Sequence, residues 1–163
     1  MPIQFYATVT GAKQGAFKTE GPQSGLGKGK IPGVAFGYSV ISPRDATTGL
    51  PTGKRQHQPV TFTKEWGAAS PQFYQSAFNN ENLTSVLIEF IGTTIDGKTI
   101  IDHTIKLTNA SIASVSQSLH DPQTGGPVID SRELQTITFT FQKIEITSTT
   151  GSTTAMDDWS IST

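Results

Sequence analysis

Apolar and polar residues alternate along much of this sequence, and alternation of that kind is typical of extended strands. In residues 99–107 (TIIDHTIKL), every second residue from Ile101 to Leu107 falls on one side of an extended chain, and polar residues fall on the other. Comparable runs predict seven strands, at residues 3–9, 34–41, 59–64, 84–91, 99–107, 110–117 and 133–147. Seven strands with barely any helix predict an all-β fold, either a sandwich or a small barrel.

The last predicted strand changes phase near its middle. The apolar residues of 137–141 share one face, whereas Ile144 and Ile146 are out of phase with them. An extra residue near Gln142 or Lys143 would explain the change. We therefore expect a β-bulge there, of the kind that turns the corners of barrels.

Residues 70–79 (SPQFYQSAFN) have the pattern of a short helix. Ser70 can accept hydrogen bonds from the free N–H groups of the first turn, and Pro71 suits the first helical position. The apolar residues that follow recur at helical spacing on one face. A helix this short is not stable alone, so it must lie across the sheet or close a barrel end.

Residues 92–99 (GTTIDGKT) match the phosphate-binding pattern GxxxxGK followed by Ser or Thr. A working phosphate loop leads directly into a helix, whose N-terminal N–H groups bind the phosphates. Here the match is followed by the alternating run 99–107, and Asp96 and Gly97 are a favoured pair for a tight turn. The segment therefore predicts a β-hairpin, with a nucleotide site as the alternative. We expect no cofactor.

The composition limits the class of protein further. The chain has no Cys, which excludes disulfides and thiolate metal sites. No apolar stretch approaches the length of a membrane span, and the first residues lack the basic and apolar regions of a signal peptide. We expect a protein that is made in the cytosol and does not insert into membranes. The net charge of −1 disfavours nucleic acid as a partner.

The charges are distributed unevenly along the chain. Residues 1–64 contain eight Lys and Arg against two acids, a net charge of +6, and residues 65–163 contain four against eleven, a net charge of −7. Two interpretations stay open. The halves could interleave within one fold and neutralise each other, or they could form opposite faces that let copies stack head to tail.

Two segments rich in Gly and Pro, residues 21–33 and 42–58, are expected to be loops. The first reads as a flexible turn. The second is too long for a simple connection and is either a flexible insertion or a projecting arm that docks on a neighbouring molecule. Its single Leu among charged residues resembles an interface anchor. Its candidate interaction residues are Arg44, Asp45, Thr47, Thr48, Gly49, Leu50, Lys54 and Arg55.

No catalytic or metal-binding motif is visible. The three His residues lie far apart in the sequence, and none has a His, Asp or Glu partner at the spacing of a metal motif. Asp157 and Asp158 could be paired carboxylates, but we expect them to be solvated residues in front of Trp159. The sequence therefore predicts no catalytic residue and no metal site.

Four segments together carry a family resemblance. They are HQPVTFTKEWGAASPQFYQSAF (57–78), the strand pair around DGK (96–98), TIKLTNASIASVS (104–116), and FTFQKIEIT followed by DDW (139–159). On the basis of these four segments, the chain from about residue 34 onward resembles the haemolysin-coregulated protein (Hcp) family, the tube subunit of bacterial type VI secretion systems. The N-terminal third, with its Gly-rich segment 21–33, departs from the family pattern.

The resemblance implies one domain over residues 1–163: a small β-barrel of two packed antiparallel sheets with one short flanking α-helix. It implies homohexameric rings that stack into a hollow tube, with a spike protein, a contractile sheath and effector proteins as partners. It implies no enzyme, and export through the secretion apparatus without a signal peptide. By position, residues 42–58 correspond to the family's extended loop at the ring-to-ring contact.

Other functions stay open at this point. A tail-tube subunit of a phage-like or extracellular contractile injection system has the same architecture. A monomeric β-sandwich that binds a carbohydrate or another small ligand belongs to a different class. It would present aromatic side chains on a concave face, whereas most of the nine Phe here fall at expected core positions.

Overall fold

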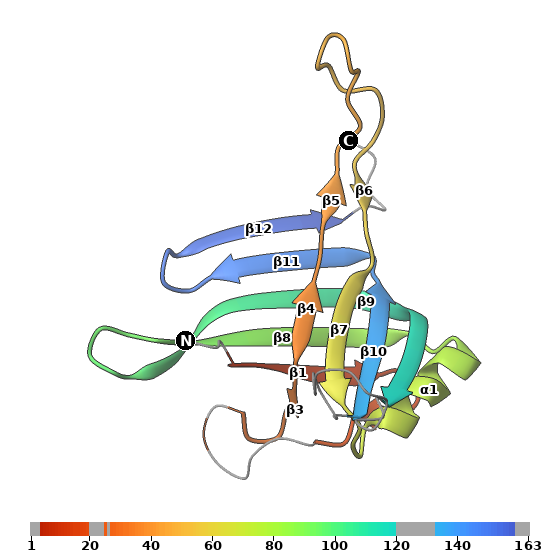
Figure 1. Ribbon diagram of the computed structural model, residues 1–163, viewed down its shortest axis with the longest axis vertical. Coiled ribbons are helices and arrows are strands. Elements are labelled where there is room, and N and C mark those ends of the chain that lie inside the picture. Colours follow the sequence, from red (N-terminus) through yellow and green to blue (C-terminus); the bar gives the residue numbers. More distant parts are fainter. Residues whose placement is uncertain (1–3, 20–24, 26, 120–132, 159–163) are drawn as a thin grey trace, which may run out of the picture.

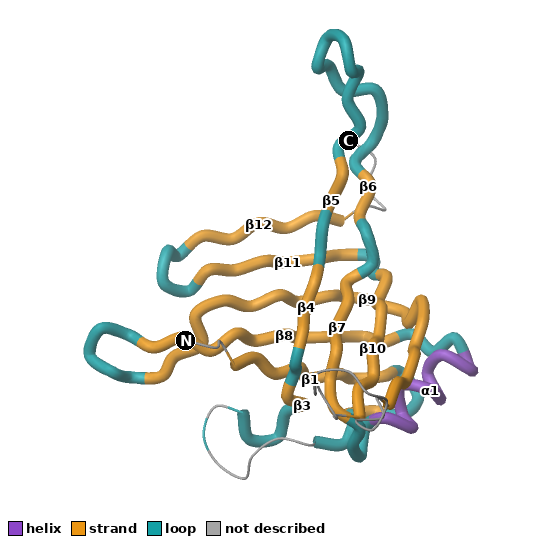
Figure 2. Tube along the Cα trace, viewed as in Figure 1, coloured by secondary structure: helices purple, strands orange, loops and turns teal. Residues whose placement is uncertain are grey.

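The computed structural model describes the chain except for residues 1–3, 20–24, 26, 120–132 and 159–163. Strands dominate the described part, which has a single α-helix (Figures 1 and 2). The elements in chain order are β1 (Gln4–Gly11), β2 (Gly15–Ala16), β3 (Ile31–Pro32), β4 (Ala35–Gly37), β5 (Val40–Ile41), β6 (Gln56–His57), β7 (Val60–Glu65), α1 (Ser70–Asn79), β8 (Leu83–Thr93), β9 (Thr99–Leu119), β10 (Glu133–Thr140), β11 (Lys143–Ser148) and β12 (Thr153–Asp158).

The strands form two antiparallel layers that share the long strand β9. In the first layer, β1 pairs with β8, β8 with the first half of β9, that half with β11, and β11 with β12. In the second layer, the other half of β9 pairs with β10, β10 with β7, and β7 with β4. The strands of the second layer run across those of the first (Figure 1).

β9 changes layers at Asn109, and the chain that follows β10 changes layers beside it. Asn109 has φ 51°, in the left-handed region that Asn tolerates better than most residues. The Gln142 N–H donates to the carbonyl of Thr108 at 3.2 Å, and the Asn109 amide donates to the Gln142 side-chain oxygen at 2.9 Å. These contacts form a corner between the layers.

The core lies between the two layers. Phe5 from β1 meets Phe62 from β7 edge to face, with ring centroids 5.9 Å apart. Most of the Phe side chains are buried in this core or packed against it. Burial of such a side chain stabilises the fold by about 1.5–3 kcal/mol. The aromatic residues therefore fill the interior, and Phe78 is the strongly exposed exception among the described ones.

The predicted fold class, two packed antiparallel sheets with one short helix, is confirmed. Among the described strands the barrel does not close, because β4 pairs only with β7 and β12 pairs only with β11. Two of the described ion pairs, Lys30–Glu89 and Arg55–Asp157, join the positive half of the sequence to the negative half. For these charges the interleaved arrangement is the correct one.

The strand boundaries differ from the prediction around the corner. Residues 99–107 and 110–117 belong to one continuous strand, β9, because Asn109 bends the chain without ending the ladder. Conversely, the single strand expected at 133–147 is two strands in different layers, β10 and β11, separated near the expected bulge. The strand expected at 34–41 is divided into β4 and β5, and β12 was not predicted.

The helix predicted at 70–79 is confirmed, but Ser70 does not cap it. Ala69 occupies the N-cap position, and no side chain bonds to the free N–H groups there. The Ser70 hydroxyl instead accepts from the Gly67 N–H and from the buried Lys64 ammonium, both at 3.0 Å. Lys64 also donates to the Gln135 side chain of β10 at 3.4 Å. The start of the helix is therefore tied to the second layer.

Residues 92–99 form the predicted β-hairpin between β8 and β9. Gly97 has φ 82°, and the Thr94 N–H donates to the carbonyl of Lys98 at 2.8 Å. A strand, β9, follows in place of the helix that a phosphate loop requires. The nucleotide alternative therefore has no structural support.

Gly11, at the end of β1, is expected to tolerate no side chain. Glu81 is 2% exposed and accepts the N–H groups of Lys13 and Gln14 through Oε2 at 3.3 and 3.2 Å. A Cβ on Gly11 would lie 2.0 Å from this oxygen. Gly11→Ala should therefore lower the free energy of unfolding by about 1–3 kcal/mol, measured by urea denaturation.

Gly37→Ala is the matched control, because a Cβ there would meet nothing within 4 Å. Equal stability of the two variants would contradict the close packing of Glu81 against Gly11.

Candidate functional site

The segment expected as a long loop, residues 42–58, is most of a projecting hairpin. We call residues 40–57 the arm. It begins with β5 and ends with β6, which pair through Val40–His57 and Ile41–Gln56. Figures 1 and 2 show the arm extending well beyond the two layers, with a long loop at its tip.

The tip of the arm is held by its own hydrogen bonds. Asp45 accepts from the Thr47 N–H at 2.7 Å, from the Thr47 hydroxyl at 2.6 Å and from the Thr48 N–H at 3.2 Å. These bonds hold the pKa of the Asp45 carboxyl below its usual value, and the bond from the Thr47 hydroxyl has the largest effect. Gly49 has φ 73°, which suits Gly, and its N–H donates to the Asp45 carbonyl at 2.8 Å. Four of the candidate residues therefore build the tip.

Two other candidate residues are presented to solvent at this end of the arm. Leu50 is 63% exposed, and Arg44, which forms an isolated bridge with Pro51, is exposed as well. Leu50 has the exposure that the sequence interpretation required of an interface anchor. Lys54 is also exposed, on the returning side of the arm.

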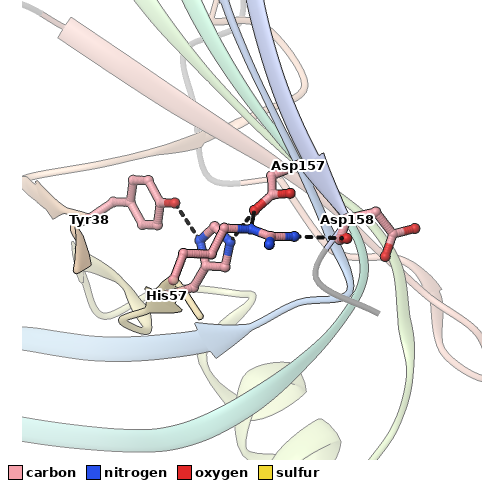
Figure 3. Close-up of polar contacts among 5 residues, drawn as sticks. Tyr38, His57, Asp157 and Asp158 are labelled. Carbon is pink, nitrogen blue, oxygen red and sulfur yellow. Dashed lines mark hydrogen bonds and ion pairs between the residues drawn. The ribbon is translucent and has the colours of Figure 1, made fainter. Parts of the chain in front are cut away.

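Arg55, the last candidate residue, lies at the base of the arm and belongs to a polar network whose other members are labelled in Figure 3. It forms an ion pair with Asp157 of β12 and donates to the Asp158 carbonyl at 3.3 Å. His57 Nε2 lies 2.6 Å from Asp157 Oδ2, and Tyr38 Oη lies 2.7 Å from His57 Nδ1. We call Tyr38, Arg55, His57 and Asp157 the root network.

Every member of the root network has a matching partner. An ionised carboxylate only accepts hydrogen bonds, so Nε2 of His57 carries the proton toward Asp157. In the neutral ring, Nδ1 then accepts from the Tyr38 hydroxyl. The Arg55 hydrogen bond is the main reason that the pKa of Asp157 lies below its usual value. Burial raises the pKa of Tyr38, and the negative charge of Asp157 raises it further.

The root network corrects one expectation. Asp157 is not simply a solvated residue: its side chain is 30% exposed, and it bonds to Arg55 and His57. No His has an acidic partner at the spacing of a metal motif, but the fold brings Asp157 to His57. Sequence spacing could not reveal the contact, because about 100 residues separate the partners. Trp159, the residue that Asp157 and Asp158 were expected to precede as an anchor, lies outside the described residues.

An apolar groove of about 350 Å³ lies between the base of the arm and the β11–β12 hairpin. Its lining residues are Tyr38, Val40, Ser42, Arg55, His57, Ile144, Ile146, Ala155, Met156 and Asp157. Val40 and Met156 are 50% and 61% exposed. The groove exists because β11 and β12 extend the first layer beyond the part that the second layer covers (Figure 1).

The described residues contain no group of three or more His, Cys, Asp or Glu side chains placed to hold a metal ion. Within that same part of the chain, no helix combines the length and apolar character needed to cross a membrane.

Removing the charge of Asp157 should destabilise the protein in a pH-dependent way. The pKa of Asp157 is lower in the folded than in the unfolded protein, so its contribution is present above the ordinary value of about 4 and is lost as the pH falls through the folded pKa. Asp157→Asn should lower Tm by about 2–4 °C near pH 7, and this difference should shrink below about pH 4. Scanning calorimetry from pH 7 to 3 measures both. A difference that stays constant to pH 3 would contradict the ionised network.

The comparison with known proteins identifies a family. The model for "Type VI secretion system effector, Hcp" matches residues 6–147. The "Major exported protein" of Pseudomonas aeruginosa PAO1 is 33% identical over 167 residues, which cover 98% of this chain and 96% of that protein.

Solved structures agree with this assignment. The secreted protein Hcp3 of Pseudomonas aeruginosa has a TM-score of 0.77 and 25% identity, covering 97% of this chain and 99% of its own. A crystal structure of an Hcp protein has a TM-score of 0.87 at 22% identity, with 97% and 98% covered, and supports the fold alone. From the family model and the identity to the exported protein together, the chain belongs to the Hcp family of type VI secretion system proteins.

Proposed function

We propose that this chain is the tube subunit of a type VI secretion system. Six copies form a ring, and rings stack head to tail into a hollow tube. The tube is expelled with the spike protein when the contractile sheath shortens, and it carries effector proteins. Membership of a family of secreted type VI proteins supports this role, which is structural and involves no catalytic step.

The observation that carries the stacking part of the proposal is the shape of the arm. Residues 40–57 leave the body of the molecule (Figure 1) and form their own hydrogen bonds, and Leu50 and Arg44 within them are exposed to solvent. The exposed tip of this projection, with Leu50, is not part of the core of its own chain. It is suited to bind the next ring, where burial of Leu50 would be favourable.

Arg55 forms an ion pair with Asp157 of its own chain. We therefore expect the contact with the next ring to rest mainly on the exposed Arg44 and Leu50. Acids such as Asp121 or Asp130 are our candidates to receive the arm on a neighbouring ring, and both lie outside the described residues. Exposed ion pairs contribute only about 0.2–1 kcal/mol each, but a sixfold interface repeats each of them.

Purified protein should form hexamers of ring shape. The core is modest and the sheets leave open edges, so burial of surface between subunits would stabilise the fold. Size-exclusion chromatography with light scattering gives the mass, and negative-stain microscopy gives the ring. A monodisperse monomer at micromolar concentration would refute the tube function.

Stacking of rings should depend on the arm tip and on ionic strength. Arg44→Glu and Leu50→Ser should each shorten tubes at low salt while rings persist, because the tip makes no contact with the core. Raising the ionic strength from about 0.05 to 0.5 M shortens the screening length from above 10 Å to roughly 4 Å and should shorten parent tubes. Tube length is measured by electron microscopy and dynamic light scattering.

Lys106→Glu is the control for the charge change, because Lys106 is an exposed residue of β9, away from the arm. If Arg44→Glu and Leu50→Ser stack as well as the control variant across the salt series, the arm is not the stacking element.

A further inference from the structure

Hydrogen bonds join the two sides of the arm to each other, but these bonds do not determine its direction. Two short segments connect it to the body, one leading from β4 into β5 and the other from β6 into β7. The hydrogen bonds along the arm, such as Thr52 N–H to the Pro43 carbonyl at 3.0 Å, join its two sides to each other. They would survive unchanged if the whole arm tilted. Its direction must therefore be set where it meets the sheets.

Apolar packing leaves the base of the arm loosely supported on one side. The groove of about 350 Å³ separates Val40 and Ser42 of the arm from Ile146, Ala155 and Met156 of β11 and β12. Interiors that fix a geometry by packing have few voids larger than a water molecule. This space leaves room for the angle between the arm and the β11–β12 hairpin to change. Packing against β11 and β12 therefore does not fix the direction of the arm.

The root network spans that groove. Asp157 Oδ2 accepts from both Arg55 and His57 on the returning side of the arm, and His57 in turn bonds to Tyr38, which lies in the connecting segment between β4 and β5. Beneath them Phe141, next to the corner, meets the rings of His57 and Tyr38 edge to face at 5.2 and 6.1 Å. One carboxylate thus links the returning side of the arm to β12 directly, and the segment that leads into the arm through His57 and Tyr38 (Figure 3).

We propose that Asp157 is a positioning residue that sets the direction of the arm, and that the arm stacks rings only when Asp157 holds it. The second half rests on the proposed function, whereas the direction of the arm can be measured without tubes. Asp157 touches no neighbouring ring in this scheme. It acts through Arg55 and His57, whose charge-assisted hydrogen bonds are the strong type.

A spin label at the tip tests the direction directly, and the absence of Cys makes the labelling site-specific. Ala46→Cys places the label in the exposed turn of the tip. The label is read in Asp157→Asn, in Tyr38→Phe, in the conservative Asp157→Glu, and in the control Glu145→Gln. Glu145 also lies in the β11–β12 hairpin and forms an ion pair with Lys143 at 3.2 Å, but it faces the opposite side of the sheet from Asp157. Spectra are recorded at 25 °C at high salt, on protein shown to be folded by circular dichroism.

The parent and Glu145→Gln should give the broad line shape of a label held by the body. Asp157→Asn should give the narrowed line shape of nanosecond motion, Tyr38→Phe a smaller narrowing, and Asp157→Glu a partial return to the parent shape. A merely structural role would change the melting temperature without changing the label in the folded state. If Asp157→Asn folds and its label is as immobile as the parent's, the proposal is wrong. If Asp157→Asn does not fold, Tyr38→Phe decides in the same way.

The unlabelled variants then test the consequence for stacking. Asp157→Asn should raise the protein concentration needed for tube growth by roughly tenfold or more, because each ring must first order its arms. Rings should persist. A mobile label with unchanged tube growth would overturn the link between direction and stacking. Parent protein that forms no tubes at all would instead refute the proposed function, and the label result would still stand.

Discussion

The fold depends on one shared bend. β9 contributes to both layers because Asn109 adopts the left-handed conformation and turns the strand without interrupting its pairing. The chain after β10 turns at the same place, and Gln142 joins the two bends by bonding to the backbone of residues 108 and 109 and to the Asn109 side chain. A single strand ladder can therefore wrap around the core, and the layers need no separate connection to stay in register.

The corner also explains where the candidate site lies. β11 and β12 continue the first layer past the bend, where the second layer no longer covers them. Their inward face carries Ile144 and Asp157, and Phe141 marks the edge of the core beside them. The arm starts above this uncovered face. The sheet consequently offers the arm both an apolar surface and one acidic residue, and these two provide the groove and the root network.

Local signals in the sequence predicted the local structure. Asp96–Gly97 predicted the β8–β9 turn against the phosphate-loop match, and helical spacing with Pro71 predicted α1. The phase change near Gln142 indicated the corner, although a periodicity argument could not tell a bulge inside one strand from a change of layer. For the same reason two separate strands were predicted at 99–107 and 110–117, because periodicity does not show that one strand continues through Asn109 and changes its pairing partners.

Contacts across long separations were beyond such reasoning. The long loop and its exposed Leu50 followed from composition, but His57 and Asp157 gave no sign of each other, because their contact exists only after β12 has paired with β11. Lys64 is a similar case. Its side chain is fully buried, and only the fold brings Ser70 and Gln135 close enough to satisfy the ammonium.

The distance in sequence between Arg55 and Asp157, 102 residues, has a consequence for synthesis on the ribosome. The arm emerges early, but its anchor is made only after the ribosome has translated another hundred residues. A nascent or prematurely terminated chain that lacks β12 therefore also lacks Asp157, the partner of Arg55 and His57. Under the proposal above, only chains translated through β12 would have an arm that is held in its stacking direction.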